Sequence, residues 1–287
     1  MIKFSATLTC QYDAIFSPFS ATDFHLGLAW LKKSGFDAAE LCIADYNDID
    51  IQTIAKALAR QGLECTTIAS GQARKREGLS LLAKDPEVLQ RTQQRIYRHI
   101  DAAAILGSYV TIGSLRAAGY PLNAEHYRHL LAQGLSPCLD YAQKCGVTLI
   151  IEALNRYEME HLNNAAEMVS FVDFIGAPSH VGILWDVFHA NIEDPHFASA
   201  IQLMGTRLRH VHFADSNRAF PGYGHLSFDD IYRQLLHCGY QGAISLECLN
   251  RPSAEVVIEE SGPFIQRLRQ LSVAKPLMSK TQYQPQC

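Results

Sequence analysis

Short apolar runs alternate regularly with longer amphipathic segments, and this alternation limits the possible folds of the chain most strongly. At five places a helical pattern ends, a glycine follows, and a new apolar run begins: Gly35, Gly62, Gly107, Gly146 and Gly239. Glycine at such a position favours the left-handed backbone that ends a helix. Eight strands alternating with eight helices predict a closed parallel (β/α)8 barrel rather than a doubly wound open sheet.

The expected strands are short runs rich in apolar residues, and the expected helices have apolar residues three and four positions apart. The strands are predicted at 2–8, 38–43, 63–69, 109–112, 147–154, 181–186, 208–214 and 243–249. The helices are predicted at 23–33, 51–60, 86–106, 123–144, 164–175, 197–204, 227–238 and 255–271. The segment 71–78 is expected to be a polar, basic loop. We expect one barrel domain over 1–271 and a polar C-terminal tail over 272–287.

Composition and charge narrow the class of protein. The 287 residues are 48% hydrophobic and 19% charged, which suffices for the core of one large α/β domain. The formal net charge is -4 and no basic face is concentrated anywhere, so neither nucleic acid nor a membrane is an expected partner. The first residues are expected to form a strand and not a signal peptide. The eight cysteines lack a Cys-x-x-Cys pattern and are expected to be reduced thiols of a cytoplasmic protein.

Ionisable side chains lie near the ends of the last four expected strands. Glu152, Asp186, His212 and Glu247 are separated by 34, 26 and 35 residues, and each interval is about one strand–helix unit. His189 follows Asp186 after two residues. Because the carboxyl ends of barrel strands form one rim, the four side chains are expected to converge there.

Three carboxylates in an apolar barrel mouth require nearby positive charge, because unpaired buried charges are costly. One divalent cation meets this requirement. One imidazole and three carboxylates form an oxygen-rich ligand set that suits Mn²⁺ or Mg²⁺, with Co²⁺ and Zn²⁺ as competitors.

Each of these residues also has a purely structural explanation. A glutamate late in a strand commonly forms a salt bridge at the rim, Asp186 would cap the next turn with His189 on a loop, and Asp215 would serve as a turn residue. Of His210 and His212 we expect only one to face the barrel interior, with the other on the opposite face of the strand. The common spacing of the four residues favours the metal site over these separate explanations.

Several segments resemble the signatures of the sugar isomerase/epimerase superfamily. They are Glu152-Ala-Leu-Asn-Arg-Tyr-Glu158, Asp186-Val-Phe-His-Ala-Asn-Ile192, His212-Phe-Ala-Asp-Ser-Asn-Arg218, and Pro221-Gly-Tyr-Gly-His225 followed by a helix and Glu247. These barrels are similar to xylose isomerase, and this chain looks most like the ketose 3-epimerases of the D-tagatose and D-psicose type. The likeness is strong over 147–249 and is only a fold pattern in the first half.

The resemblance implies roles for individual residues. Glu152, Asp186, His212 and Glu247 would bind one divalent metal ion, with Mn²⁺ preferred, and Glu158, His189 and Arg218 would hold substrate oxygens. The implied reaction epimerises a free ketose at C3 through a cis-enediolate, with Glu152 and Glu247 as the acid/base pair on the two faces of the sugar. A small-molecule sugar is the expected partner, and a homo-oligomer, either a dimer or a tetramer, is the expected assembly.

Other functions remain open at this stage. Return of the proton to the neighbouring carbon would make an aldose–ketose isomerase. Hydroxypyruvate isomerases of the superfamily carry glutamine in the place of His212, which favours the epimerase. Abasic-site zinc endonucleases need further histidines after strands two and three, where this chain reads Cys42-Ile-Ala-Asp45 and Ile68-Ala-Ser-Gly71. The presence of both glutamates disfavours a non-catalytic sugar-binding barrel.

The resemblance has two departures. Ala153 stands where the family usually has proline. The expected substrate-lining segments of the first half, at 9–16 and around 70–78, match no sugar pattern, so the sugar is not identified.

Overall fold

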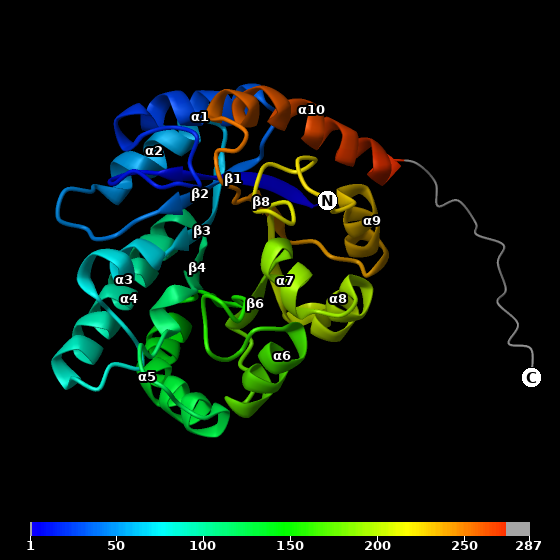
Figure 1. The fold of residues 1–287 in the computed structure, drawn as a ribbon. Coiled ribbons are helices and arrows are strands. Elements are labelled where there is room, and N and C mark those ends of the chain that lie inside the picture. Colours follow the sequence, from blue (N-terminus) through cyan, green and yellow to red (C-terminus); the bar gives the residue numbers. More distant parts are fainter. Residues whose placement is uncertain (1, 274–287) are drawn as a thin grey trace, which may run out of the picture.

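Eight parallel strands close into a barrel that helices surround (Figure 1). The computed structural model describes residues 2–273. Each strand pairs with the next one along the chain, and β8 closes the barrel against β1. The strands are β1 (Lys3–Thr9), β2 (Ala38–Cys42), β3 (Glu64–Ala69), β4 (Tyr109–Ile112), β5 (Leu149–Glu152), β6 (Val181–Asp186), β7 (Leu208–Phe213) and β8 (Ala243–Leu246). The predicted single-domain (β/α)8 barrel is confirmed.

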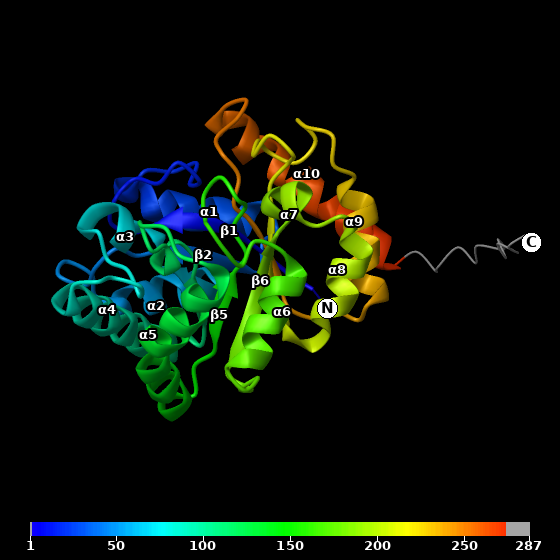
Figure 2. The same cartoon turned by 60° about the horizontal axis from the view of Figure 1, so that its bottom comes forward.

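The helices pack around the outside of the strands (Figure 2). They are α1 (Phe24–Lys33), α2 (Ile51–Gln61), α3 (Gly71–Glu77), α4 (Pro86–Leu106), α5 (Ala124–Cys145), α6 (Ala165–Phe174), α7 (Val187–Glu193), α8 (Phe197–Met204), α9 (Phe228–His237) and α10 (Ala254–Val273). The five glycines predicted to end helices all have positive φ, between 62° and 83°. This left-handed backbone ends each helix and turns the chain back toward the next strand.

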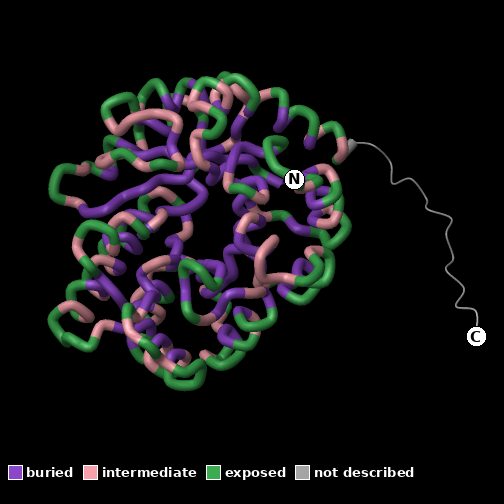
Figure 3. The backbone as a smooth tube through the Cα atoms, viewed as in Figure 1, coloured by how far each residue is buried: buried purple, intermediate pink, exposed green. Residues whose placement is uncertain are grey.

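The core lies between the strands and the inner faces of the helices, and the exposed residues lie on the outer faces of the helices (Figure 3). The interior of the barrel differs from that core because it contains polar side chains. Thr67 on β3, for example, hydrogen-bonds Thr111 on β4 at 2.8 Å between their Oγ1 atoms. Buried polar groups need partners of this kind. At the carboxyl ends of β5 to β8, the buried polar side chains are ionisable.

Five segments differ from the predictions. The expected loop at 71–78 contains the helix α3, and the helix α7 begins directly after β6, where no helix was expected. The fifth and eighth strands are shorter than predicted, so Glu247 follows β8 directly. Helix α10 ends at Val273 and includes the first two residues of the predicted tail, whose remainder at 274–287 lies outside the described residues.

Two further expectations concern the whole chain. The seven cysteines within the described residues are all free thiols, and Cys287 lies outside them. Within residues 2–273, no helix combines the length and the apolar character needed to cross a membrane.

Candidate active site

The carboxyl ends of β5 to β8 bring the four predicted metal ligands together. Glu152 ends β5, Asp186 ends β6, His212 lies in β7 and Glu247 follows β8. The barrel register explains the arrangement, because Asp186 pairs with His212 and His212 pairs with Ser245, two residues before Glu247. One potential ligand atom from each residue lies within 4.8 Å of the others, and all four residues are buried.

His212 is at the centre of this cluster. Its Nδ1 atom lies 3.3 Å from Glu247 Oε2, 3.6 Å from Glu152 Oε1 and 3.9 Å from Asp186 Oδ2. Neither His212 Nδ1 nor Asp186 Oδ2 has a hydrogen-bond partner among the described residues, although both atoms are buried. Orphaned buried polar atoms that face one another indicate that a further group belongs between them.

The electrostatics of the cluster also fit a cation. Burial raises the pKa of Asp186 to about 7, and burial likewise raises the pKa of Glu152. Burial alone would lower the pKa of His212, but the charges of Glu40 and Glu247 outweigh it and raise that pKa well above its usual value. The carboxylates therefore require a proton or a metal ion among them. The three carboxylates and one imidazole could hold a divalent ion.

Gly113 and Arg116, which follow β4, help to position Glu152. Gly113 leaves room for its carboxylate, since a Cβ atom there would lie 2.3 Å from Glu152 Oε2. Arg116 is fully buried and donates from Nε and Nη2 to the Glu152 carbonyl oxygen at 3.0 and 2.8 Å. It also donates to the Tyr127 hydroxyl and to the Leu162 carbonyl oxygen. Sequence reasoning missed Gly113 and Arg116, and the available signal was a Gly-Ser-Leu-Arg turn directly after a buried strand.

Asp186 has both of the roles that the sequence offered as alternatives. Its Oδ1 atom accepts a hydrogen bond from the main-chain N–H of Phe188 at 2.8 Å, which caps α7. Its Oδ2 atom remains directed toward the cluster, 3.9 Å from His212 Nδ1. His189 consequently lies in a short helix and not on a loop.

His189 presents one defined nitrogen to the site. Its Nδ1 atom accepts from the main-chain N–H of Asn155 at 3.2 Å, which assigns the proton to Nε2. Nε2 lies 3.4 Å from Arg218 Nη2 and 3.6 Å from Asp186 Oδ2. Burial and the charge of Arg218 lower the pKa of His189 well below its usual value, so the ring is neutral.

Arg218 connects the predicted substrate residues to the cluster. Its guanidinium lies between the rings of Phe16 and Phe188, 4.6 and 4.9 Å from their centroids. Nη1 lies 2.8 Å from Glu158 Oε1, and Nη2 lies 3.9 Å from Glu247 Oε2. Its φ of 63° is in the left-handed region that residues other than glycine rarely adopt. The planar group is thus fixed by charge on two sides and by aromatic rings on its faces.

Asp215 organises the loop that carries Arg218. Its carboxylate accepts hydrogen bonds from the main-chain N–H groups of Ser216, Gly222 and Leu226, at 2.7, 2.7 and 3.1 Å. The interpretation of Asp215 as a turn residue therefore describes the structure.

Both histidines of β7 face the barrel interior, so the expectation that only one would do so is wrong. Residues two positions apart in a strand point to the same face. The Nε2 atoms of His210 and His212 each lie 3.0 Å from Oε2 of Glu40 on β2. Burial raises the pKa of Glu40, but the charge of His212 and the hydrogen bonds from both rings outweigh it, so this pKa lies well below its usual value. Sequence reasoning missed Glu40, although a glutamate within an apolar strand was a usable signal.

A cavity of about 410 Å³ opens over the cluster, within the size range of small-molecule sites. Glu152, Glu247, Arg218 and Glu158 are among the residues that line it. The segment from Asp13 to Phe16, together with Gln72, Lys75 and Ser114, also lines it. The two first-half segments that were expected to face the substrate therefore border this cavity.

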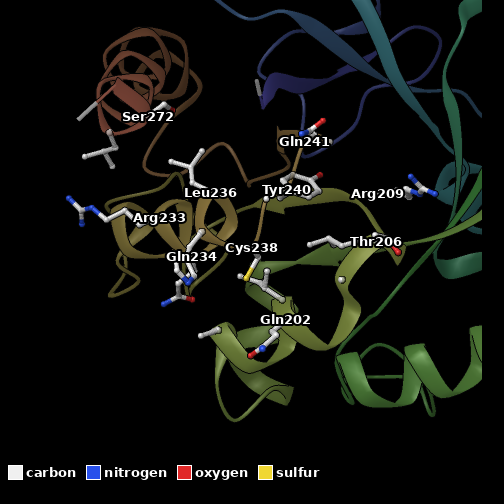
Figure 4. A pocket seen from close by; sticks show the side chains of 18 of the residues that line it. Gln202, Thr206, Arg209, Arg233, Gln234, Leu236, Cys238, Tyr240, Gln241 and Ser272 are labelled. Carbon is white, nitrogen blue, oxygen red and sulfur yellow. The ribbon is translucent and has the colours of Figure 1, made fainter. Parts of the chain in front are cut away.

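A second cavity, of about 1530 Å³, lies near the amino ends of β7 and β8, beside α8, α9 and the end of α10 (Figure 4). Arg209, Arg233 and Tyr240 are among the residues that line it, and it contains none of the predicted site residues. We assign the candidate active site to the smaller cavity, because titratable residues with perturbed pKa values converge there.

Comparison with known proteins agrees with this geometry. The family model described as a xylose isomerase-like TIM barrel matches residues 28–268. This chain belongs to that family. A D-psicose 3-epimerase of Agrobacterium fabrum is 32% identical over 227 residues, which cover 76% of this chain and 76% of the relative. A ketose 3-epimerase of Arthrobacter globiformis is 28% identical over 236 residues, which cover 80% of this chain and 78% of the relative.

The structural comparison gives the same family fold. The structure of D-psicose 3-epimerase with D-tagatose from Clostridium cellulolyticum H10 matches with a TM-score of 0.78 at 22% identity, and the match covers 94% of this chain and 99% of that one. The resemblance to ketose 3-epimerases inferred from the sequence is confirmed, as is the expectation of an enzyme of the sugar isomerase/epimerase class.

Proposed function

We propose that this enzyme of the xylose isomerase-like family epimerises a free ketose at C3 with the help of one divalent metal ion, preferably Mn²⁺. The observation that carries the proposal is the pair of buried carboxylates, Glu152 and Glu247, which flank Asp186 and His212 from β5 and β8. The names of the relatives, ketose 3-epimerase and D-psicose 3-epimerase, support the same reaction. Mg²⁺, Co²⁺ and Zn²⁺ are alternative ions for the same ligands.

Glu152, Asp186, Glu247 and Nδ1 of His212 would hold the ion. A divalent ion there would polarise the C2 carbonyl of the sugar and stabilise the negative charge that develops when C3 loses its proton. Asp186 is fixed for this role by its capping hydrogen bond, and Glu152 is fixed by the space at Gly113 and the Arg116 bonds to its carbonyl.

Glu152 and Glu247 would transfer the protons. One carboxylate removes the C3 proton and the other returns a proton from the opposite face, which inverts the carbon centre. Burial raises the pKa of Glu152, and a carboxylate with a raised pKa is a stronger base at neutral pH. Because the two glutamates come from strands separated by two others, a sugar between them would meet one on each face.

Arg218, His189 and Glu158 would bind and orient the sugar. Arg218 Nη2 lies 3.9 Å from Glu247 Oε2, so the guanidinium would hold an oxygen next to the reacting carbon. The Nε2–H group of His189 would donate to a second oxygen. Glu158 lines the cavity and would accept from a further hydroxyl while it holds Arg218 at 2.8 Å.

The alternative functions have less support from the site. An abasic-site endonuclease would need histidines after β2 and β3, where Cys42, Ala69 and Ser70 line the cavity. A sugar-binding protein without activity would need no pair of opposed proton donors. An aldose–ketose or hydroxypyruvate-type isomerase would use the same ligands, so experiment must separate it from an epimerase.

The decisive experiment incubates the enzyme with Mn²⁺ and a panel of ketoses in D₂O and locates the deuterium by NMR after the ion is removed. An epimerase places deuterium on C3 and forms the C3 epimer. Deuterium on C1 or C2 with accumulation of aldose would replace the proposal with an isomerase. Binding of sugar without any exchange would replace it with a binding protein. The homo-oligomer, dimer or tetramer, remains an expectation that light scattering can test.

A further inference from the structure

We propose that Glu40 is a positioning residue for the proposed metal centre. Its carboxylate oxygen Oε2 accepts from Nε2–H of His212 so that Nδ1 faces the three acidic ligands, and Nε2 of His210 donates to the same oxygen. This inference rests on the metal centre of the proposed function, and it assigns a role to a part of the barrel that touches neither sugar nor ion.

The contacts of Glu40 set the tautomer of both rings. Glu40 Oε2 lies 3.0 Å from Nε2 of His210 and 3.0 Å from Nε2 of His212, and all three side chains are almost completely buried. An ionised carboxylate only accepts hydrogen bonds, so both Nε2 atoms must carry protons. A neutral imidazole with its proton on Nε2 has its free electron pair on Nδ1.

This tautomer selects the ligand atom of His212. Nδ1 of His212 faces Glu152, Asp186 and Glu247 at 3.3 to 3.9 Å and has no hydrogen-bond partner among the described residues. In the other tautomer, Nε2 would turn an electron pair toward the Glu40 carboxylate and lose the hydrogen bond. Glu40 therefore holds the ring in the form in which Nδ1 can bind a cation.

His210 keeps Glu40 in place. Across residues 2–273, the basic groups within 4.0 Å of the Glu40 carboxylate are the two imidazoles, and neither lysine nor arginine contributes. The rings of His210 and His212 meet edge to face with their centroids 5.2 Å apart and share one Glu40 oxygen, so His210 restrains the oxygen that His212 uses. The carboxylate of a histidine–carboxylate pair also makes the ring a stronger ligand.

The test compares Mn²⁺ binding by the full chain and its Glu40→Gln variant. Metal-free protein is titrated with Mn²⁺, and free ion is measured by electron paramagnetic resonance. We expect the dissociation constant to rise about 10- to 100-fold in Glu40→Gln, as for other partners of metal-binding histidines. Thr67→Val is the matched control, because it removes a polar group inside the barrel whose hydrogen bond is to Thr111 and to neither Glu40 nor His212. A folded Glu40→Gln variant with unchanged affinity overturns the inference.

A second measurement needs no variant of Glu40. In wild-type protein with ¹⁵N-labelled histidine and diamagnetic Mg²⁺, His210 and His212 should both show a protonated Nε2, and His210→Gln and His212→Gln assign the signals. An unprotonated Nε2 on His212 overturns the inference even if Glu40→Gln does not fold.

Neither measurement depends on turnover. Normal Mn²⁺ binding without ketose exchange would remove the proposed epimerase and leave the role of Glu40 to be decided by these data. Wild-type protein that binds no ion would overturn the metal centre and the role of Glu40 together.

Discussion

The two halves of the barrel differ in what their strands present at the carboxyl rim. Strands β5 to β8 each bring an ionisable residue there, whereas β1 to β4 end in Thr9, Cys42, Ala69 and Ile112. Burial raises the pKa of the Cys42 thiol well above its usual value, so that rim position is neutral as well. The first half instead supplies the cavity wall and the support behind the ligands. We therefore expect proton transfer to depend on the second half, and the contacts that distinguish one sugar from another to depend partly on the first half.

The largest expected effect tests whether the second half carries the chemistry. Glu152→Gln and Glu247→Gln should each lower kcat by about 10²- to 10⁴-fold, because in each variant one face of the sugar lacks its acid or base. Glu64→Gln is the matched control, since Glu64 begins β3 in the first half and pairs with Lys3 on the surface. Steady-state kinetics and C3 deuterium exchange measure the effect. Full exchange in both variants would remove the two-carboxylate mechanism.

Metal-dependent stability should be the next largest effect, and it should depend on pH. At about 100 times its dissociation constant, Mn²⁺ should stabilise the fold by about 2.7 kcal/mol and raise Tm by roughly 5–10 °C near pH 8. The pKa of Asp186 is raised to about 7 and that of His212 lies well above its usual value. In metal-free protein both groups therefore contribute less stability as pH rises through these values.

Metal binding requires the deprotonated forms of both groups, so the increase in Tm should shrink at pH 5.5. Thermal scans with and without Mn²⁺ at both values measure this difference. Asp186→Asn in the second half should remove most of the increase, and Thr67→Val in the first half should retain it. An increase that is equal at both pH values would contradict the assignment of these ligands.

Replacement of Arg218 should separate sugar binding from metal binding. Arg218→Lys should lower kcat/KM by roughly 10- to 100-fold, equivalent to about 1.5–3 kcal/mol for hydrogen bonds to a charged group. Lysine lacks the planar fork that fits between Phe16 and Phe188. The Mn²⁺ dissociation constant should stay within about twofold of the wild-type value. The substitution removes charge-assisted hydrogen bonds to the sugar and changes none of the proposed metal ligands. Arg233→Lys on the exposed face of α9 is the control, and equal losses in both variants would disprove the role.

The smallest expected effect concerns the cavity wall of the first half. Lys75→Gln should change kcat/KM by no more than about fivefold, equivalent to about 1 kcal/mol for one exposed polar contact. The change should differ between ketoses, because Lys75 lines the cavity and is not one of the proposed metal ligands. Kinetics on the ketose panel measure it, with Lys56→Gln on α2 as the control. A loss of Mn²⁺ affinity in Lys75→Gln would contradict the division between the halves.

The strand positions and the four clustered ionisable residues were predicted well, because both repeat along the sequence with the period of the barrel. Glycines with positive φ after helices fixed the positions of the strands, and the one-per-strand spacing of Glu152, Asp186, His212 and Glu247 predicted their convergence. Both signals follow from the geometry of the barrel, so they are visible without knowledge of any contact.

The features that sequence missed depend on contacts between distant segments. Arg116 acts on a carbonyl oxygen 36 residues away, and Glu40 acts on histidines at separations of 170 and 172 residues. Helix α7 was missed because it has only 7 residues and follows β6 without a loop, so that Asp186 both ends the strand and caps the helix. The position of His210 was misjudged because the strand period was applied wrongly: residues two apart lie on one face, so His210 and His212 share it.

Helix α3 was mistaken for a loop because it buries a single residue, Ala73, and has no apolar stripe. It is held by Gln72, which donates to the Tyr12 carbonyl oxygen at 2.8 Å, by Arg76, 3.4 Å above the Tyr12 ring, and by Glu77, 2.8 Å from Arg95. Lys75 on the same helix lines the cavity and makes none of these anchoring contacts. For directed evolution, this gives a library design in which Lys75 is randomised while the three anchoring residues, Gln72, Arg76 and Glu77, stay fixed. The range of accepted sugars then becomes an adjustable property of a scaffold whose reaction centre is left unaltered.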